Sequence, residues 1–459
     1  MFGPRMKARV DGMSINPGGP NWMDPPLHYA PGPIVDSISQ SRGIAPVTAG
    51  PDSIGGAVNV TTKQADFTGD SAFSRRGDVN ASGSSADNGG SGGAFAAMAN
   101  DTHHLHALGS AEKGGDIQAG NDVEIDATQH ERYLYGGGYG VKLAPDHSLD
   151  IAFRHAKTLD SGNPSLPMDT RFTDTDMVNT GYRGKFGPTR LKARLYYSQV
   201  DHKMDNVTLR PAPGMMARRE VRAESDGLGW NLAATRRWGG GDITLGLDGH
   251  LAGHEMQIFN PSMPAFFVDN FNDIERDRYG IYSQWDRQGL AGLDNLDVEA
   301  GLRLTQVELS AGRVTSPNGP GGNVGTLRDR FNSGDRDVSD TNLDAVLKFD
   351  YQAGRATTLH LEAGRKTRSP SYIERFAWLP IEASSGLADG NNYIGDPALD
   401  PEISHEVNAG FDYTGSSLFI SPRVFYRDIN DYIQGTPATD NTVRNVGGMN
   451  GDPTPLRYS

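Results

Sequence analysis

The sequence predicts an all-β fold, a transmembrane antiparallel β-barrel, on two observations. The first is alternation: apolar side chains take every second position of long segments and polar ones lie between them, as in residues 296–304. The second is length, because a tilted strand needs about ten residues to cross a bilayer. Roughly fifteen such segments follow one another, which indicates a sheet with lipid on one face and water on the other.

The composition fits a barrel and excludes several other classes. No apolar run approaches the ~18 residues that a membrane-spanning helix requires, so a helical membrane protein is excluded. A mean hydropathy of -0.53 is compatible with a barrel because the inward half of every strand is polar. The net charge of -14 argues against a nucleic-acid partner, and the absence of cysteine removes disulfides and thiolate metal sites.

Two regions differ along the chain. Residues 1–65 are rich in proline and methionine and do not alternate, which predicts a small domain of short strands and loops. Residues 75–459 alternate and carry turn signals such as that at 144–147. Long polar inserts at 312–340 and 380–400 are expected to be surface loops at one end of the barrel, with tight turns at the other.

Both ends of the chain are expected to be incomplete. No signal peptide precedes the first region, and residues 447–459 read as a loop with no closing strand after it. We therefore expect an open wall whose edge strands are unpaired.

Several motifs resemble TonB-dependent outer-membrane receptors. Residues 34–47 and 50–60 resemble the second half of the plug domain of that family, with Gly43 and the pair Gly55 and Gly56 as its structural glycines. Three later stretches resemble barrel segments of the same family: residues 364–374, 395–410 and 425–433.

The resemblance implies a receptor in the outer membrane of a Gram-negative bacterium. Residues 1–65 would be part of a plug, and residues 75–459 would be about 15 strands of a 22-stranded barrel in contact with lipid. The family is driven by the TonB energy-transducing complex through an N-terminal motif that this sequence does not contain.

A narrower resemblance concerns copper. The loop at residues 16–29 is similar to the plug loop of TonB-dependent copper receptors, the OprC and NosA group. In that group a Cys-x-x-x-Met pair on the plug meets a His-x-Met pair on the barrel. Met23 matches the plug methionine, Gly19 stands at the position of the cysteine, and His254 and Met256 match the barrel pair. The resemblance implies copper as the transported ligand, with no bound cofactor.

The residues themselves support the barrel half of this site. In residues 242–259 the apolar phase is set by Ile243 and Leu245, which places His254 and Met256 on the lumenal face, about 7 Å apart along the strand. Thioether and imidazole groups suit copper, Cu(I) in particular, better than calcium or magnesium. Three further donors are predicted as accessory ligands: Met13, His28 and His250.

The leading alternative is the same kind of receptor with a ferric siderophore or cobalamin as its ligand. A passive porin would lack the plug pattern of residues 50–60, and a soluble sandwich or adhesin would expose a large apolar face to water. His104 and His106 share a strand face and are interpreted as a hydrated lumenal pair. No nucleophile elbow, phosphate loop or paired-carboxylate motif is found, so no enzyme activity is expected.

Overall fold

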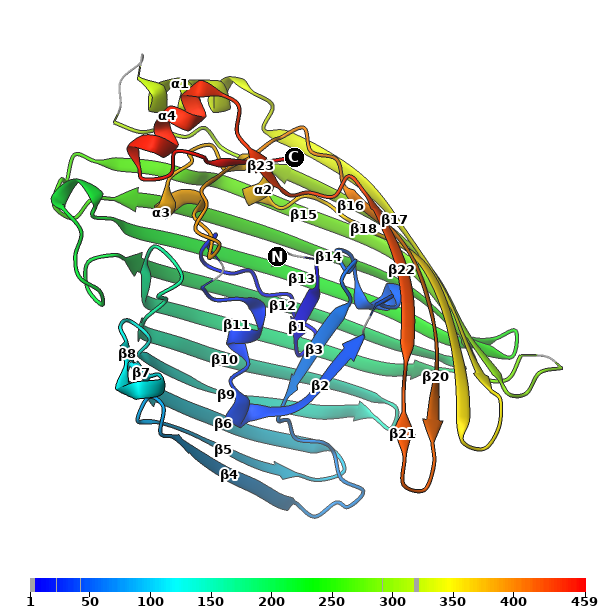
Figure 1. Ribbon diagram of the computed structural model, residues 1–459. Helices are drawn as coiled ribbons and strands as arrows, with labels where there is room; N and C mark the ends of the chain where they lie inside the picture. The colour runs from blue at the N-terminus through cyan, green and yellow to red at the C-terminus, as the bar shows by residue number, and fades with distance from the viewer. Residues whose placement is uncertain (1–4, 22, 42, 291, 318–321) are drawn as a thin grey trace.

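The structure is a computed structural model that describes residues 5–21, 23–41, 43–290, 292–317 and 322–459. A 16-stranded antiparallel sheet forms a curved wall around a small inner domain built from the first 65 residues (Figure 1). Trp22 and Arg42, which belong to the motifs of the sequence analysis, lie outside the described residues.

The wall is a meander in which each strand up to β20 pairs with the next wall strand along the chain, and the last two segments, β21 and β22, both pair with β20. The wall strands are β4 (Ser74–Ser84), β5 (Gly89–Ala99), β6 (His103–Gly114), β9 (His130–Ala144), β10 (His147–Ser161), β11 (Asp169–Phe186), β12 (Thr189–Asp205), β13 (Glu220–Trp238), β14 (Gly241–Phe259), β15 (Phe267–Arg287), β16 (Leu296–Ser310), β17 (Asp337–Gln352), β18 (Thr357–Arg368), β20 (Glu402–Thr414), β21 (Phe419–Ile420) and β22 (Arg423–Asn430). The predicted antiparallel barrel fold is confirmed. None of the helices in the described ranges is long and apolar enough to span a membrane.

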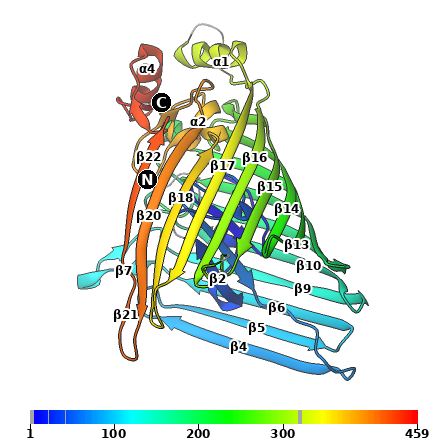
Figure 2. The same cartoon turned by 90° about the vertical axis from the view of Figure 1, so that its right-hand side faces the viewer.

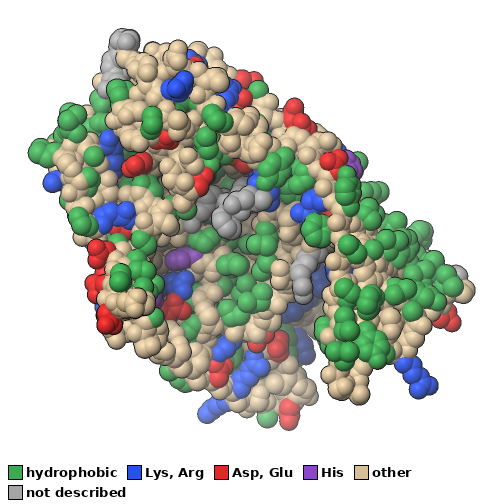
Figure 3. All heavy atoms as spheres, viewed as in Figure 1, with side chains coloured by type: hydrophobic (Ala, Val, Ile, Leu, Met, Phe, Trp, Pro, Cys, Tyr) green, Lys and Arg blue, Asp and Glu red, His purple; other side chains and the backbone are tan. Residues whose placement is uncertain are grey.

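The two faces of the wall differ as the alternation predicts. Leu302 and Leu304 on β16 are 60% and 47% exposed, whereas Arg303 between them is 1% exposed. Figure 3 shows hydrophobic side chains gathered over the outer side of the wall. The outward face is therefore the apolar, lipid-facing one, and charged side chains on the inward face are buried against the inner domain.

A charge on the outward face should destabilise the protein strongly. We expect Leu304→Arg to lower the free energy of unfolding by about 2–4 kcal/mol near the bilayer midplane, because the guanidinium would lie in hydrocarbon. Urea unfolding of the protein folded into lipid vesicles measures the loss, with Leu304→Met as the matched apolar control. Equal losses in the two variants would contradict a lipid-facing position for Leu304.

The wall is open. In the described part of the chain the edge strands β4 and β22 do not pair with each other, so the sheet does not close (Figure 2). The expectation of an open sheet is confirmed.

The inner domain lies on the concave side of the wall. Its sheet has the order β1 (Lys7–Val10), β3 (Ala57–Thr62) and β2 (Val35–Ser41), and its 3-10 helices are η1 (Pro26–Tyr29), η2 (Gly32–Ile34) and η3 (Val47–Ala49). Gly56 has a φ of 103°, and a Cβ there would collide with the carbonyl oxygen of Ser41. Only glycine fits this close approach of two chain segments. Residues 17–21, 23 and 24, between β1 and η1, are called the inner loop below.

Ion pairs join the inner domain to the wall. Asp52 accepts hydrogen bonds from Arg276 at 3.3 Å and from Arg278 at 3.0 Å, both on β15. Arg5 pairs with Glu402 on β20. The inner domain therefore packs against the charged inward face of the wall.

The two ends of the wall differ in loop length. Tight turns close one end, such as that between β9 and β10, and the other end carries every α-helix of the described residues. The elements of this long-loop end are β7 (Ile117–Gln118), η4 (Gly120–Asp122), β8 (Glu124–Ile125), η5 (Met215–Ala217), α1 (Asn323–Ser333), α2 (Tyr372–Phe376), α3 (Glu382–Ser385), β19 (Tyr393–Ile394), β23 (Gly435–Pro437), α4 (Asn441–Met449) and β24 (Leu456–Tyr458).

The loops at this end are more ordered than the sequence predicts. Residues 312–340 contain α1 and the start of β17, and residues 447–459, expected to form a loop, contain the end of α4 and all of β24. α1 packs on α4, and both contribute buried side chains to one apolar cluster, among them Leu327 and Val446. Tertiary packing of this kind stabilises short helices whose own sequence signal is weak.

Candidate functional site

The inner loop docks on β11 and β12 near the long-loop end of the wall. The hydroxyl of Thr170 on β11 donates to Sδ of Met23 at 3.6 Å, and Thr170 is the strand partner of Met204 on β12. A Cβ at Gly19 would lie 2.8 Å from Cε of Met204 and 3.3 Å from Nδ1 of His202. The inner loop therefore faces a His-x-Met pair formed by His202 and Met204.

The His202 ring has no hydrogen-bond partner. Its side chain is 0% exposed, and neither ring nitrogen makes a hydrogen bond with any described residue. Nδ1 lies 3.4 Å from Oδ1 of Asp24 in the inner loop. Burial alone would raise the pKa of Asp24, but the His202 ring and hydrogen bonds from Tyr29 and Gly18 hold that pKa below its usual value. A buried carboxylate thus lies beside an unpartnered imidazole.

Methionine side chains gather around this pair. Met168, Met204 and Met256 are at most 1% exposed and belong to one apolar cluster, against which Met23 packs. Ala223 on β13 pairs with His202 on one side and with Met256 on the other, so these two residues share a row roughly 10 Å apart. The sulfur and imidazole groups of the two strands are thus separated by the small side chain of Ala223.

The pair predicted from the sequence is lumenal but already has partners. His254 and Met256 are 7% and 1% exposed on the inward face of β14. Nε2 of His254 lies 3.1 Å from the hydroxyl of Tyr372, and Sδ of Met256 accepts from the side-chain amide of Asn270 at 3.3 Å. Burial raises the pKa of Tyr372 well above its usual range, so the phenol stays protonated and can donate. A ligand role for His254 and Met256 stays a prediction.

The predicted accessory ligands have other partners as well. Met13 is buried in a separate apolar cluster. Nε2 of His28 lies 2.7 Å from the hydroxyl of Thr158, and Nε2 of His250 lies 3.3 Å from the carbonyl oxygen of Ser14. Their role as ligands also stays a prediction.

The sequence analysis missed His202 and Met204, although the same pattern marks them. Leu195 and Tyr197 on β12 are 53% and 40% exposed, so the even-numbered positions of this strand face inward. The sequence alone shows this alternation of outward and inward positions along β12. A search for His-x-Met on the lumenal phase of every predicted strand would have found both pairs.

The predicted hydration of His104 and His106 stays a prediction. The two residues are only 5% and 8% exposed on β6, and Phe67 packs edge-on against the His104 ring. Nε2 of His104 lies 2.8 Å from the carboxylate of Asp150. The segment that follows β3 covers part of this lumenal face, and a cavity of about 340 Å³ lined by both histidines lies beside it.

A cavity of about 710 Å³ lies between the inner domain and the wall. Gly19 of the inner loop and His254 and Tyr372 of the wall side line it, and its surface is mostly apolar. The cavity is much larger than a bare metal ion and adjoins the inner loop.

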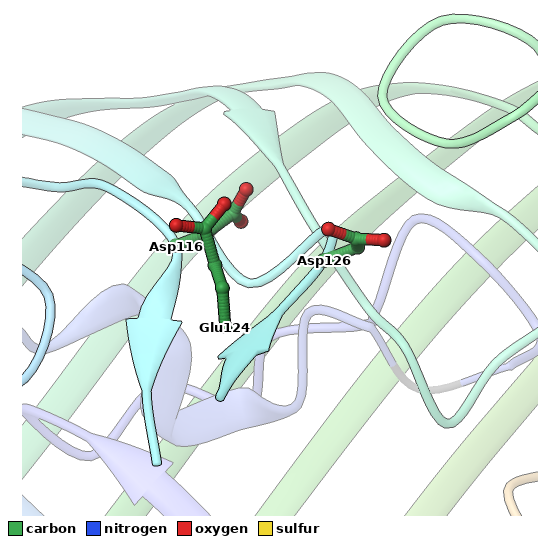
Figure 4. Close-up of side chains that lie close together, drawn as sticks. All are labelled: Asp116, Glu124 and Asp126. Carbon is green, nitrogen blue, oxygen red and sulfur yellow. The ribbon is translucent and has the colours of Figure 1, made fainter. Parts of the chain in front are cut away.

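A second group of possible metal ligands lies on the β7–β8 hairpin (Figure 4). Asp116, Glu124 and Asp126 each bring one ligand oxygen within 4.8 Å of the others. Asp116 already accepts hydrogen bonds from the backbone amides of Thr128 and Gln129. These bonds explain the position of Asp116 as part of the hairpin structure, and we assign it no ligand.

The open wall with an apolar outer face and an enclosed inner domain defines an outer-membrane barrel protein. Its residues 112–450 match the family model described as TonB dependent receptor-like, beta-barrel. The chain therefore belongs to the TonB-dependent receptor family, whose members lie in the outer membrane of Gram-negative bacteria. No curated protein sequence matches the chain.

Solved structures share the fold. The copper transporter OprC is 19% identical with a TM-score of 0.79, over 95% of this chain and 65% of that one. The hemophore receptor HasR of Serratia marcescens is 14% identical with a TM-score of 0.67, over 95% and 67% of the two chains. The siderophore receptor PirA from Pseudomonas aeruginosa is 16% identical with a TM-score of 0.61, over 99% and 71%. The chain thus spans 65% of the length of OprC.

Proposed function

We propose that this chain belongs to a TonB-dependent receptor that takes up copper, held between the inner loop and the wall. Residues 1–65 would act as part of the plug and residues 75–459 as part of the barrel, with the TonB complex as the energy source. A copper transporter is among the proteins that share the fold. The chain carries out no chemistry on its cargo in this proposal: it binds the ion and releases it.

The strongest support for copper is the set of donor groups at the contact between inner loop and wall. Met23 and Met204 offer two thioethers at the contact between inner loop and wall, and His202 offers an imidazole whose ring nitrogens have no hydrogen-bond partner among the described residues. Soft and borderline donors of this kind suit copper, and three of them suffice for a Cu(I) centre. His254 and Met256 form a second pair on the inward face of β14, separated from His202 and Met204 by β13, and the ion would move from the first pair to this one.

A ferric siderophore or another metal chelate is the second candidate. The cavity of about 710 Å³ beside the inner loop favours it, because a bare ion would leave most of that space empty. Arg276 and Arg278 line the same cavity and would attract an anionic chelate. Ferric iron, however, prefers oxygen ligands and would make no use of buried thioethers.

Copper titration of single variants tests the proposal. Met23→Ala, His202→Ala and Met204→Ala should each weaken Cu(I) binding at least about tenfold, which corresponds to ~1.4 kcal/mol. His254→Ala and Met256→Ala should weaken it less, because these side chains have other partners. The measurement is competition with bicinchoninate under reducing conditions, on the full chain in detergent, and Met215→Ala, 59% exposed, is the control.

Which variants lose the most Cu(I) affinity decides whether the ion binds at His202 and Met204 or at His254 and Met256. Larger losses for His254→Ala and Met256→Ala would move the site to the pair predicted from the sequence. Unchanged affinity in all five variants would overturn copper as the ligand and leave the chelate as the better candidate.

A further inference from the structure

We propose that Asp24 is a positioning residue of this copper site, and that it takes over the charge a thiolate would otherwise supply. Asp24 holds the His202 ring so that the Nδ1–H group of the ring faces the Asp24 carboxylate and Nε2 faces the metal. This inference rests on the proposed function and adds to it how the imidazole is oriented and how the charge of the ion is balanced.

The two oxygens of Asp24 have different surroundings. Oδ2 accepts the backbone amide of Gly18 at 2.6 Å and the hydroxyl of Tyr29 at 2.6 Å. Oδ1 accepts no hydrogen bond from any described residue, and Nδ1 of His202 lies 3.4 Å from it. A buried anionic oxygen without a donor is costly, so the proton of the imidazole belongs on Nδ1.

This proton position leaves Nε2 with a free lone pair. A neutral imidazole carries one N–H, and Nε2 of His202 is buried without a partner. An unpaired buried acceptor costs about 1–3 kcal/mol, a cost that a bound metal ion would remove. Histidines that bind metals usually donate their other N–H to a carboxylate or carbonyl, which fixes the ring and strengthens the ligand.

Charge balance gives Asp24 its second role. Thioethers and imidazole are uncharged, and the chain has no cysteine that could provide a thiolate. Asp24 is 1% exposed and forms no ion pair with a lysine or arginine of the described residues, so its negative charge is not balanced by protein cations. A monovalent ion such as Cu(I), bound at the far side of the His202 ring, would balance it.

A double-mutant cycle tests whether Asp24 acts through His202. Cu(I) affinity is measured by bicinchoninate competition for wild type, Asp24→Asn, His202→Ala and the double variant, as full chains in detergent. Asp24→Asn should weaken binding about 10–100-fold in the wild-type background. It should have little further effect once His202 is alanine, because the ring that it positions is then absent.

Four controls separate positioning from folding. Tyr29→Phe removes a bond to Oδ2 only and should leave the affinity close to wild type. Asp24→Glu keeps the carboxylate and should recover most of the affinity that Asp24→Asn loses. Copper X-ray absorption should show one nitrogen ligand in wild type and none in His202→Ala, and thermal melting of the metal-free variants reports their folding.

The possible outcomes are distinct. An unchanged affinity in Asp24→Asn, or an equal loss in both backgrounds, would overturn the inference while the copper site stands. If His202→Ala and Met204→Ala also bind copper as tightly as wild type, the proposed site itself fails. Should Asp24→Asn not fold, Asp24→Ser, which also removes the carboxylate, is compared with Asp24 in the two His202 backgrounds: a loss confined to the background that keeps His202 supports the inference, and an equal loss in both overturns it.

Discussion

Replacing Arg368 with alanine is expected to lower the free energy of unfolding by about 3–5 kcal/mol, the cost of breaking a buried ion pair. Arg368 is 0% exposed, and its guanidinium donates to Glu402 at 2.6 Å and to Glu374 at 2.7 and 3.0 Å. The variant leaves the buried carboxylate of Glu374 without this cation. Glu402 also binds Arg5 of the inner domain, so the loss reaches the contact between inner domain and wall.

Urea unfolding in detergent, followed by tryptophan fluorescence, measures this loss. Arg330→Ala is the matched control, because Arg330 pairs with Asp440 at 2.7 Å but its side chain is 53% exposed. Exposed pairs contribute only about 0–1 kcal/mol. Similar losses in the two variants would show that the buried network around Arg368 does not hold the structure together.

The two faces of the wall could be predicted from the sequence because the alternation within each strand shows them. The alternation of Leu302, Arg303 and Leu304 fixes which side chains meet lipid, whatever strand lies beside them. The helices α1 and α4 could not be predicted in this way. They form where two loops distant in sequence bury Leu327 and Val446 together, and that contact is set by the tertiary structure.

The proposed copper site could be predicted only in part, because contacts between distant segments of the chain decide the rest of it. The type of donor and the inward phase of His254 and Met256 are properties of a single strand. Which strand meets the inner loop depends on how the inner domain docks, and that docking is set by contacts such as those of Asp52 with β15. Two strands carry His-x-Met on the lumenal phase, so the sequence pattern alone does not choose between His202 and His254.

The inner loop offers a direct way to strengthen the site. We expect Gly19→Cys to tighten Cu(I) binding on the order of a hundredfold, which corresponds to about 2.7 kcal/mol. A Cβ at this position would lie 2.8 Å from Cε of Met204, the flexible end of a proposed ligand side chain that can move aside. The thiolate is a soft, anionic ligand that binds Cu(I) more strongly than a thioether does.

Gly19→Ser is the matched control, because the hydroxyl has nearly the same size but is a poor ligand for Cu(I). Bicinchoninate competition under reducing conditions should rank the cysteine variant above wild type and the serine variant near it. The added thiolate should also make Asp24 less important, so that Asp24→Asn costs less affinity when Cys replaces Gly19. Equal affinities for the cysteine and serine variants would mean that the inner loop does not face the bound ion, because a thiolate this close to Met204 would otherwise join the ligand set.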